Sequence, residues 1–390
     1  MVTSSSVPPP LSVLLGVCWD PEANVGGVPL RWRQLQHTLA QVGPLYTFVA
    51  AESCEHGQFD HPPVYLQDQD GQFRDPYHSQ YCPDAQNTLN QLTHSHHFDV
   101  MIFSGLWMAP YMLRLPANNT SALVLDTHNL QSDLERQIAR SMGPNAPEWL
   151  TPQYLDGIER LERLAMTAAS SIWVCSQLDL QETRRLHPDT ASRLVIVPNA
   201  VPVPGRLPPP VPITKITFIG RLDYGPNRMA AQFIIDQLHP ALDGLAAQLQ
   251  CIIAGAWPIQ DLADAATSSP ILLVEDPDDV EPLRRGSISI VPLFEGSGTR
   301  MKVLEAMAAG SPIVSTAKGV EGVGAVPGEH YLQAETASQF NHAINQLMND
   351  PQLRSQVVTN AHHLVKKRYS YEVAVTTVRS ALADHRLRRR

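Results

Sequence analysis

Short apolar runs alternate along the chain with amphipathic segments long enough to form helices. In the first half, segments 30–42 and 154–169 show helical periodicity. The apolar runs that flank such segments have the length and composition of strands, and they occupy residues 11–17, 44–50, 98–103, 122–126, 171–175 and 194–198. Strands that alternate with helices predict a parallel, doubly wound sheet with helices on both faces.

One segment interrupts this alternation because it holds too much proline for a helix or a central strand. It reads PNAVPVPGRLPPPVP over residues 198–212, and each proline lacks the N–H that either element needs. Beyond it the pattern restarts, with strand-like runs at 215–219, 250–254, 271–274, 288–291 and 313–315. The chain is therefore expected to be an α/β protein with two Rossmann-like domains.

These patterns also give expected domain boundaries. We expect a disordered tail at 1–10, a first domain at 11–200, a proline-rich linker at 201–213, a second domain at 214–370, and a C-terminal helix with a basic tail at 371–390. The last helix is a candidate for packing back on the first domain.

The segment from Ser287 to Thr316 carries the clearest chemical signal. An apolar run is followed by the glycine-rich loop 296–298, a helical segment that is expected to open at Thr299, and a second apolar run. A strand, tight turn and helix in this order present backbone N–H groups and the positive end of a helix dipole to a phosphate. Arg300 and Lys302 follow in the first turn, where a bound anion would offset the unfavourable position of two cations. The alternative is a solvated pair of Lys302 and Glu305 beside an ordinary helix cap.

Composition and net charge limit the kinds of molecule that the protein is expected to bind. The chain has 390 residues, 43% of them hydrophobic, and a net charge of −9. Residues 1–200 contain 11 Lys and Arg against 20 Asp and Glu, which argues against nucleic acid and against docking of this half on an anionic membrane. The basic segment 385–390 is expected to be a solvated tail, with a weak peripheral membrane or partner contact as the alternative.

The cysteines and the N-terminus indicate the compartment. Five cysteines, an odd number without any CxxC pair, predict free thiols in a reducing environment. The N-terminal segment lacks the basic residues of a secretory signal, and the apolar run 11–17 is too short to span a bilayer. We expect a cytoplasmic protein.

In parallel sheets, ligands bind beyond the carboxyl ends of the strands, so two such domains facing each other create a cleft. The loops that follow strands are therefore the candidate site. They are residues 24–27, 126–129, 220–221, 275–276, 295–300 and 319–322.

Several motifs resemble a known family. FIGRLDYGPNRMAAQFI (218–234), IIAGAWP (252–258), GSGTRMKVLEAMAAGSPIVST (296–316) and GVEGV (319–323) resemble the donor-binding domain of GT-B glycosyltransferases of family 4. The glycine pair Gly26-Gly27 and YSYEVAV (369–375) fit the same family, while the rest of the first domain resembles it more weakly. The resemblance implies a retaining hexosyl transfer, without metal or other cofactor, from a nucleoside-diphosphate sugar to a glycan, lipid-linked or small-molecule acceptor. Polysaccharide biosynthesis is the context that it suggests.

The resemblance also assigns roles to residues. His128 matches a cleft histidine near the reacting sugar, with a helix-capping or merely buried histidine as the alternative, while Arg300 and Lys302 would neutralise the leaving diphosphate. Glu305 matches the carboxylate that accepts hydrogen bonds from the ribose, and the main chain around Asp276 would hold the base. The full expected donor site comprises Gly26, Gly27, Arg221, Asn227, Asp276, Glu295, Ser297, Gly298, Thr299 and Glu305.

Two departures from the family pattern keep other functions open. Ser297 stands eight positions before Glu305, where many relatives have the first of two glutamates, and Glu295 lies two residues further back. No lysine follows Gly220-Arg221 closely, although many relatives have one there. A sugar-nucleotide hydrolase or epimerase, and a non-catalytic nucleotide-binding or scaffold relative, remain alternatives.

No metal site is expected. Asp68 and Asp70 lie in a polar loop with no preceding strand, and Asp276 and Asp278 lie where the base would bind. The cluster of His94, His96 and His97 is expected to be solvated.

Overall fold

The computed structural model describes residues 10–18, 27–50, 81–143, 150–256, 258, 260–296 and 300–388. The tail 1–9, most of the loop before Gly27, the aspartates Asp68 and Asp70, and the last two residues lie outside this range.

The first domain is built on a six-stranded parallel sheet with the strand order β2-β1-β3-β4-β5-β6. Its central strands β1 and β3 are buried along their whole length, which is why each forms a continuous apolar run in the sequence. The strands are β1 (Val13–Val17), β2 (Leu45–Val49), β3 (Val100–Ser104), β4 (Ala122–Asp126), β5 (Ser171–Val174) and β6 (Leu194–Ile196).

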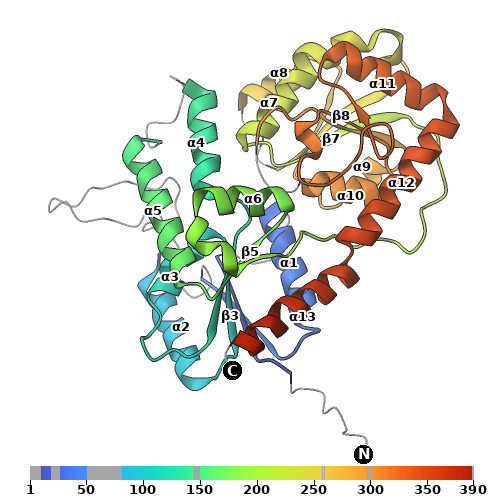
Figure 1. The fold of residues 1–390 in the computed structure, drawn as a ribbon. Coiled ribbons are helices and arrows are strands. Elements are labelled where there is room, and N and C mark those ends of the chain that lie inside the picture. The colour runs from blue at the N-terminus through green and yellow to red at the C-terminus, as the bar shows by residue number, and fades with distance from the viewer. Residues whose placement is uncertain are drawn as a thin grey trace, which may run out of the picture.

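Helices cover both faces of this sheet (Figure 1). Two of them begin at hydrogen-bonding caps, because the Thr151 side chain accepts from the Tyr154 N–H and the Ser176 side chain from the Asp179 N–H. The helices are α1 (Gly27–Leu39), α2 (Pro83–Ser95), α3 (Ala109–Leu113), α4 (Gln131–Met142), α5 (Pro152–Ala168) and α6 (Gln177–Leu186).

The second domain repeats the architecture with the strand order β12-β11-β10-β7-β8-β9, again with parallel pairing. The prediction of two doubly wound sheets is thus confirmed, although the short edge strand β12 was not predicted. The strands are β7 (Lys215–Ile219), β8 (Gln250–Gly255), β9 (Leu272–Glu275), β10 (Ser287–Val291), β11 (Ile313–Ser315) and β12 (Leu332–Gln333).

The helices of the second half include α10, which follows the glycine-rich loop. It begins at Met301, with Arg300 as its N-cap residue, and ends at Gly310 in the left-handed conformation. The expected start at Thr299 was therefore two residues early. The helices are α7 (Gly225–Phe233), α8 (Gln260–Thr267), α9 (Glu281–Arg284), α10 (Met301–Ala309), α11 (Ala337–Asn349), α12 (Pro351–Tyr369) and α13 (Tyr371–Arg388).

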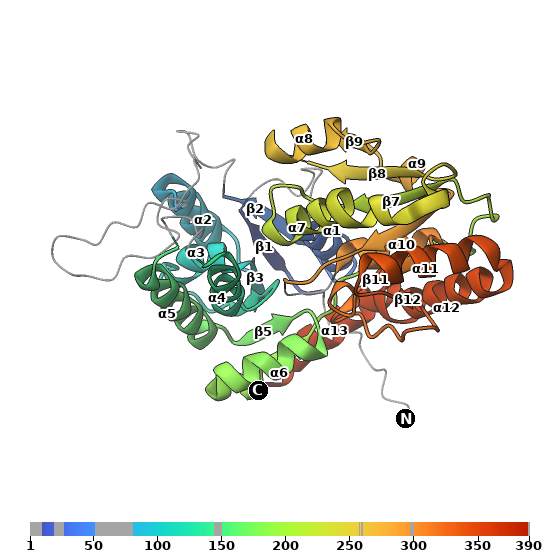
Figure 2. The same cartoon turned by 90° about the horizontal axis from the view of Figure 1, so that it is seen from above.

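The chain passes between the two domains twice, and the two crossings meet. The Val201 N–H, in the proline-rich segment, donates to the Tyr369 carbonyl at 2.8 Å, just before α12 gives way to α13. Helix α13 then lies beside α1 of the first domain (Figures 1 and 2), where Arg379 Nη2 donates to the Gln41 carbonyl at 2.8 Å. Val378 and Leu382 of α13 are buried in the first hydrophobic core. The C-terminal helix therefore ties the second domain back to the first.

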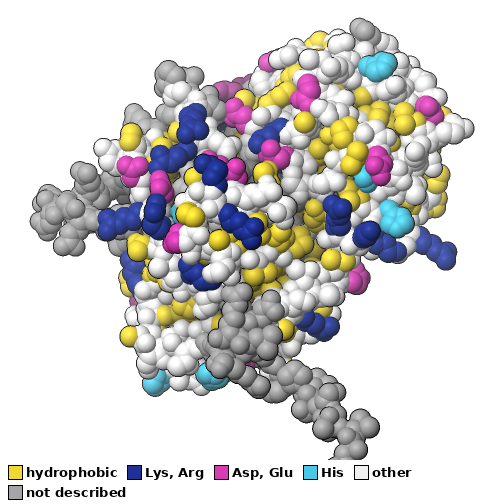
Figure 3. All heavy atoms as spheres, in the orientation of Figure 1, with side chains coloured by type: hydrophobic (Ala, Val, Ile, Leu, Met, Phe, Trp, Pro, Cys, Tyr) yellow, Lys and Arg dark blue, Asp and Glu magenta, His cyan; other side chains and the backbone are white. Residues whose placement is uncertain are grey.

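The surface of the first domain is less uniformly acidic than its net charge implies. Figure 3 shows dark blue side chains gathered over the face where α4, α5 and α6 lie. Several of these arginines pair with neighbouring carboxylates, including Arg136 with Glu159 at 2.6 Å and Arg185 with Glu182 at 2.7 Å. In the described part of the chain no helix is long and apolar enough to cross a membrane.

The cysteines only partly match the expectation of free thiols. Cys18, Cys175 and Cys251 are free and buried, and burial raises the pKa of each thiol to about 12. Cys82 is disulfide-bonded, so the prediction of free thiols throughout was wrong at this position.

Close approach between two strand ends gives a test of the second domain's packing. A Cβ added at Gly255 would lie 1.7 Å from the carbonyl oxygen of Gly220, so the backbone there has no room for a side chain. We expect Gly255→Ala to lower the free energy of unfolding by about 3 kcal/mol, measured by urea denaturation. Gly205→Ala is the matched control because a Cβ there meets nothing within 4 Å, and an equal loss in both variants would contradict the packing argument.

Candidate functional site between the two domains

The amino ends of helices α1 and α10 adjoin across the two domains. A Cβ at Gly27, the first residue of α1, would lie 3.7 Å from Cγ of Met301, the first residue of α10. Both helices present N-terminal N–H groups in this region, which favours an anion between the domains.

A buried polar cluster lies at the carboxyl end of β4. Arg31 Nη2 of α1 donates to Asp126 Oδ1 at 2.6 Å, and Ser104 Oγ donates to Asp126 Oδ2 at 2.6 Å. Asp126 is fully buried and Arg31 is 1% exposed. Burial alone would raise the pKa of Asp126, but the charge of Arg31 and the contact with His128 hold that pKa well below its usual range. Asp126 is thus a buried, ionised carboxylate.

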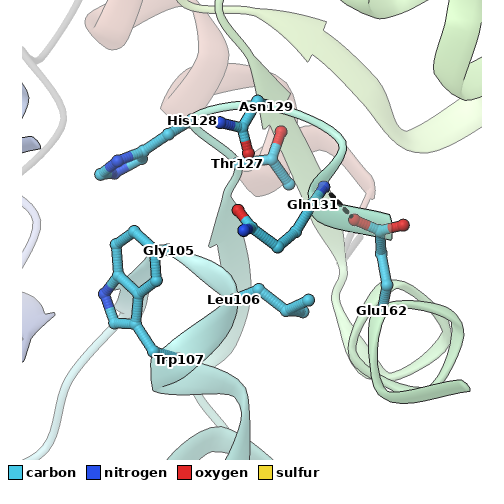
Figure 4. Close-up of a pocket in the computed structure, with 8 residues that line it drawn as sticks. All are labelled: Gly105, Leu106, Trp107, Thr127, His128, Asn129, Gln131 and Glu162. Atoms are coloured by element: carbon cyan, nitrogen blue, oxygen red, sulfur yellow. Dashed lines mark hydrogen bonds between the residues drawn. The ribbon is translucent and has the colours of Figure 1, made fainter. Parts of the chain in front are cut away.

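His128 lies above this cluster. Its Nε2 is 2.9 Å from Ser104 Oγ and 3.6 Å from Asp126 Oδ2. The imidazole packs edge-on against Trp107, with ring centroids 5.5 Å apart, and against Trp32 at 6.4 Å. Figure 4 shows the ring extending over the Trp107 side of a small cavity of about 10 Å³, which is room for about one water molecule. His128 is therefore held by specific contacts rather than by general burial.

In the second domain, the ammonium group of Lys302 points inward between β7 and α7. Its Nζ donates to Asn227 Oδ1 at 2.7 Å and lies 4.2 Å from the centroid of the Phe218 ring. A Cβ at Gly220 would be 2.7 Å from Nζ, so the glycine makes room for the cation. Burial, and then the charge of Arg300, lower the pKa of Lys302 to about 7.

Arg300 precedes Lys302 and is 7% exposed. Its Nη1 would lie 3.1 Å from a Cβ at Gly296, so the guanidinium covers the start of the glycine-rich loop. Burial lowers the pKa of Arg300, while Tyr224, Glu321 and Asp179 raise it. Two cations therefore lie near each other where α10 begins, and of these Arg300 is buried and Lys302 is half-buried.

Glu305 and Lys302 each have a partner other than one another. Glu305 Oε2 accepts from Arg284 Nη2 at 2.8 Å, while Lys302 bonds the amide of Asn227. The alternative of a solvated Lys302–Glu305 pair was therefore wrong. The Glu305 side chain keeps 24% of its surface exposed, so part of the carboxylate still faces outward.

The remaining predicted residues of the second domain lie at strand ends. The Arg221 guanidinium is held by Asp223 through bonds of 2.7 and 3.0 Å, and its carbonyl accepts from Asn227 Nδ2 at 2.8 Å. Asp276, just after β9, has φ +41°, a conformation that is uncommon outside glycine and clusters at ligand sites. Its N–H donates to the Gly255 carbonyl at 3.0 Å.

A cavity of about 390 Å³ lies between the domains. Helix α4 supplies one wall, and Phe294 and Glu295, after β10, supply part of the other. Phe294 is 41% exposed, so the cavity has an aromatic surface beside a carboxylate. The complete lining is Leu134, Gln137, Ile138, Arg140, Pro226, Phe294, Glu295, Gly296 and Lys318.

Four predicted site residues, Gly26, Ser297, Gly298 and Thr299, lie outside the described residues. Of the others, the structure brings Asn227, Arg300 and Lys302 together and places His128 on the first domain.

Sequence reasoning missed several residues that complete these clusters. Arg31, Ser104 and Arg284 hold Asp126, His128 and Glu305 through contacts between distant segments. Tyr224 lies near Arg300 of the second domain and Glu135 of α4 in the first. Burial raises the pKa of the Tyr224 hydroxyl, the charge of Arg300 lowers that pKa, and the charge of Glu135 raises it. The only sequence signal for Tyr224 was its place in the loop after a predicted strand.

One of the three clustered histidines, His96, makes contacts of another kind. His96 contacts Tyr46, with ring centroids 5.1 Å apart, and its Nδ1 is 2.9 Å from Ser95 Oγ. Within the described ranges, no three His, Cys, Asp or Glu side chains converge as a metal site requires.

Comparison with known proteins places this geometry in a class. Residues 213–350 match the family model "Glycosyl transferases group 1". Sequence comparison with curated proteins finds no match.

Solved structures share the whole fold. Sucrose-phosphate synthase from Thermosynechococcus elongatus has 16% identity and a TM-score of 0.72, covering 97% of this chain and 98% of that one. Anabaena Alr3699/HepE in complex with UDP-glucose has 14% identity and a TM-score of 0.67, covering 96% and 100%. WaaG, a glycosyltransferase of lipopolysaccharide biosynthesis, has 15% identity and a TM-score of 0.61, covering 93% and 97%.

The two Rossmann-like domains of this chain have the GT-B fold that these structures share. Residues 213–350, which make up most of the second domain, form a domain of the glycosyl transferases group 1 family.

The lowered pKa of Lys302 predicts how stability changes with pH. Between about 7 and 10.5 the unfolded lysine binds more protons than the folded one, so this group makes the free energy of unfolding rise with pH in that window. We expect urea denaturation to show that Lys302→Met reduces the gain between pH 7 and 9.5 by about 2 kcal/mol. Identical gains in the two proteins would show that the folded lysine is not desolvated.

Proposed function

We propose that the protein is a retaining, metal-independent glycosyltransferase that moves a sugar from a nucleoside-diphosphate sugar to an acceptor hydroxyl. The observation that best supports this proposal is the position of the half-buried Lys302 beside Arg300 at the N-terminal end of α10. Lys302 bonds a neutral amide, and the second cation lowers its pKa further. A diphosphate supplies the negative charge that such a site favours.

The surrounding residues fit a nucleotide donor. Arg300 and Lys302 would stabilise the charge that develops on the diphosphate as the sugar leaves. Glu305, held through one oxygen by Arg284, can accept from the ribose hydroxyls with the other. The backbone at Asp276 would hold the base. The UDP-glucose complex of Alr3699/HepE, which has the same fold, supports a donor of this chemical type.

The loop between β10 and α10 completes this proposal. Backbone N–H groups at Gly298 and Thr299 would bind the diphosphate beside Ser297, and the glycine pair Gly26-Gly27 would face it from the first domain. Arg221 would add positive charge on release from Asp223. Glu295 would approach the donor sugar from the interdomain cavity.

The first domain would supply the acceptor side. His128, in the cleft-facing loop after β4, would contact the reacting sugar, and the cavity against α4 would take the acceptor. In a front-face mechanism the leaving diphosphate itself takes the acceptor proton, so retention needs no separate base. We propose a glycan, a lipid-linked sugar or a small molecule as acceptor, and a cytoplasmic location.

Calorimetry tests the donor site directly. We expect one of UDP, GDP and ADP to bind with micromolar affinity that EDTA does not change. Because the diphosphate should raise the pKa of Lys302, binding near pH 8 should take up a proton. The binding enthalpy should therefore depend on the ionisation enthalpy of the buffer.

Charge variants provide the control for this titration. Lys302→Gln and Arg300→Gln should each weaken nucleotide binding about a hundredfold. Lys367→Gln removes an exposed lysine on α12 and should leave the affinity unchanged. Failure of every nucleotide to bind would favour the alternative of a scaffold protein.

Product analysis distinguishes transfer from hydrolysis. With the donor identified by calorimetry, we expect NMR to show an α-linked product from an α-linked donor, formed only with an acceptor. Rapid release of free sugar regardless of acceptor would identify a hydrolase, and a new sugar nucleotide would identify an epimerase.

A further inference from the structure

Beneath His128, three side chains form an ordered series of hydrogen bonds. Ser104 Oγ is 2.6 Å from Asp126 Oδ2 and 2.9 Å from His128 Nε2. Ser104 and Asp126 are both fully buried, so water does not compete for these contacts. The proposed transfer reaction uses His128 but assigns no role to the groups below it.

The direction of each hydrogen bond follows from the number of protons available. Asp126 is ionised beside Arg31 and can only accept, whereas the Ser104 hydroxyl has a single hydrogen to donate. If that hydrogen pointed at His128, two oxygens 2.6 Å apart would face each other without a proton between them. Ser104 therefore donates to Asp126 and accepts from His128. The Nε2 atom must carry the ring proton.

We propose that Ser104 and Asp126 are positioning residues that hold His128 as the Nε2–H tautomer and leave Nδ1 as a hydrogen-bond acceptor for a hydroxyl of the sugar substrate. Among the described residues none hydrogen-bonds Nδ1, while Trp32 and Trp107 fix the plane of the ring. The substrate contact rests on the function proposed above, whereas the tautomer depends on the protein alone.

Arg31 is the anchor of this arrangement. Its Nε and Nη2 bond the two oxygens of Asp126 at 3.4 and 2.6 Å, and its Nη1 donates to the Pro198 carbonyl at 2.9 Å. Gln34 Nε2 donates to the same carbonyl at 2.9 Å, and Gln34 Oε1 accepts from the Ala200 N–H at 2.8 Å. The carboxylate is thus fixed on two sides and cannot turn away from Ser104.

NMR of the whole protein labelled with ¹⁵N-histidine tests the tautomer without any substrate. The chain has 15 histidines, so loss of one signal in His128→Gln assigns the resonance. We expect the wild type to show a slowly exchanging Nε2–H proton and an unprotonated Nδ1. A proton on Nδ1 in the wild type would overturn the proposal.

We expect Asp126→Asn to reverse the direction of the hydrogen bonds between residue 126, Ser104 and His128. Arg31 can only donate, so it would bind the new amide oxygen and turn the amide NH₂ toward Ser104. Ser104 would then accept from the amide and donate to Nε2, which moves the ring proton to Nδ1. We expect the NMR signature to invert and kcat/KM to fall about tenfold or more, while the affinity for the nucleotide is unchanged. An unchanged tautomer in a folded variant would overturn the proposal.

Ser104→Ala provides a second test in case Asp126→Asn does not fold. It keeps the Arg31–Asp126 pair and removes only the bridging hydroxyl. We expect the Nε2–H signal to be lost to solvent exchange and kcat/KM to fall about tenfold. Persistence of a slowly exchanging Nε2–H would overturn the role of Ser104. The expected tautomers in a protein that transfers no sugar would refute the proposed function and leave the positioning role intact.

Discussion

Burial of positive charge at the start of α10 is the constraint on which the second domain's chemistry depends. A buried cation is costly unless it has a counter-charge, and the ammonium of Lys302 faces an amide, an aromatic ring and a second cation. Gly220 leaves the space that the ammonium occupies, and Asn227 ties it to the Arg221 carbonyl. The fold therefore maintains an electrostatically unfavourable arrangement that an anion at the helix terminus would relieve.

In the first domain, by contrast, the buried charges are paired with each other. Asp126 and Arg31 neutralise each other within the protein, and their pairing joins α1, β4 and the start of the interdomain segment at Pro198. A few residues beyond Pro198, at Val201, this segment meets the second crossing of the chain at Tyr369. The second domain thus gathers positive charge at the start of α10, whereas the first holds a histidine above a carboxylate that an arginine already neutralises. This asymmetry is suited to a donor that carries a diphosphate and to a neutral sugar hydroxyl.

Sequence patterns predicted the strands well for a physical reason. Parallel strands buried on both faces are continuous apolar runs, and eleven of them stood out between helical segments. Strand β12 was missed because it has only two residues. The cation pair Arg300 and Lys302 was also predictable, because both lie in one short motif. The partners Arg31 and Asp126 are 95 residues apart, as Arg284 and Glu305 are 21 apart. Such pairings depend on sheet order and helix placement, which local periodicity does not contain.

The most direct test of the account is a crystal structure of the protein with the nucleoside diphosphate that binds most tightly. The account predicts the two phosphates at the amino end of α10, within hydrogen-bond distance of Lys302 and Arg300, and the ribose hydroxyls on Glu305. Phosphates bound elsewhere, with Lys302 still facing only Asn227 and Phe218, would contradict it.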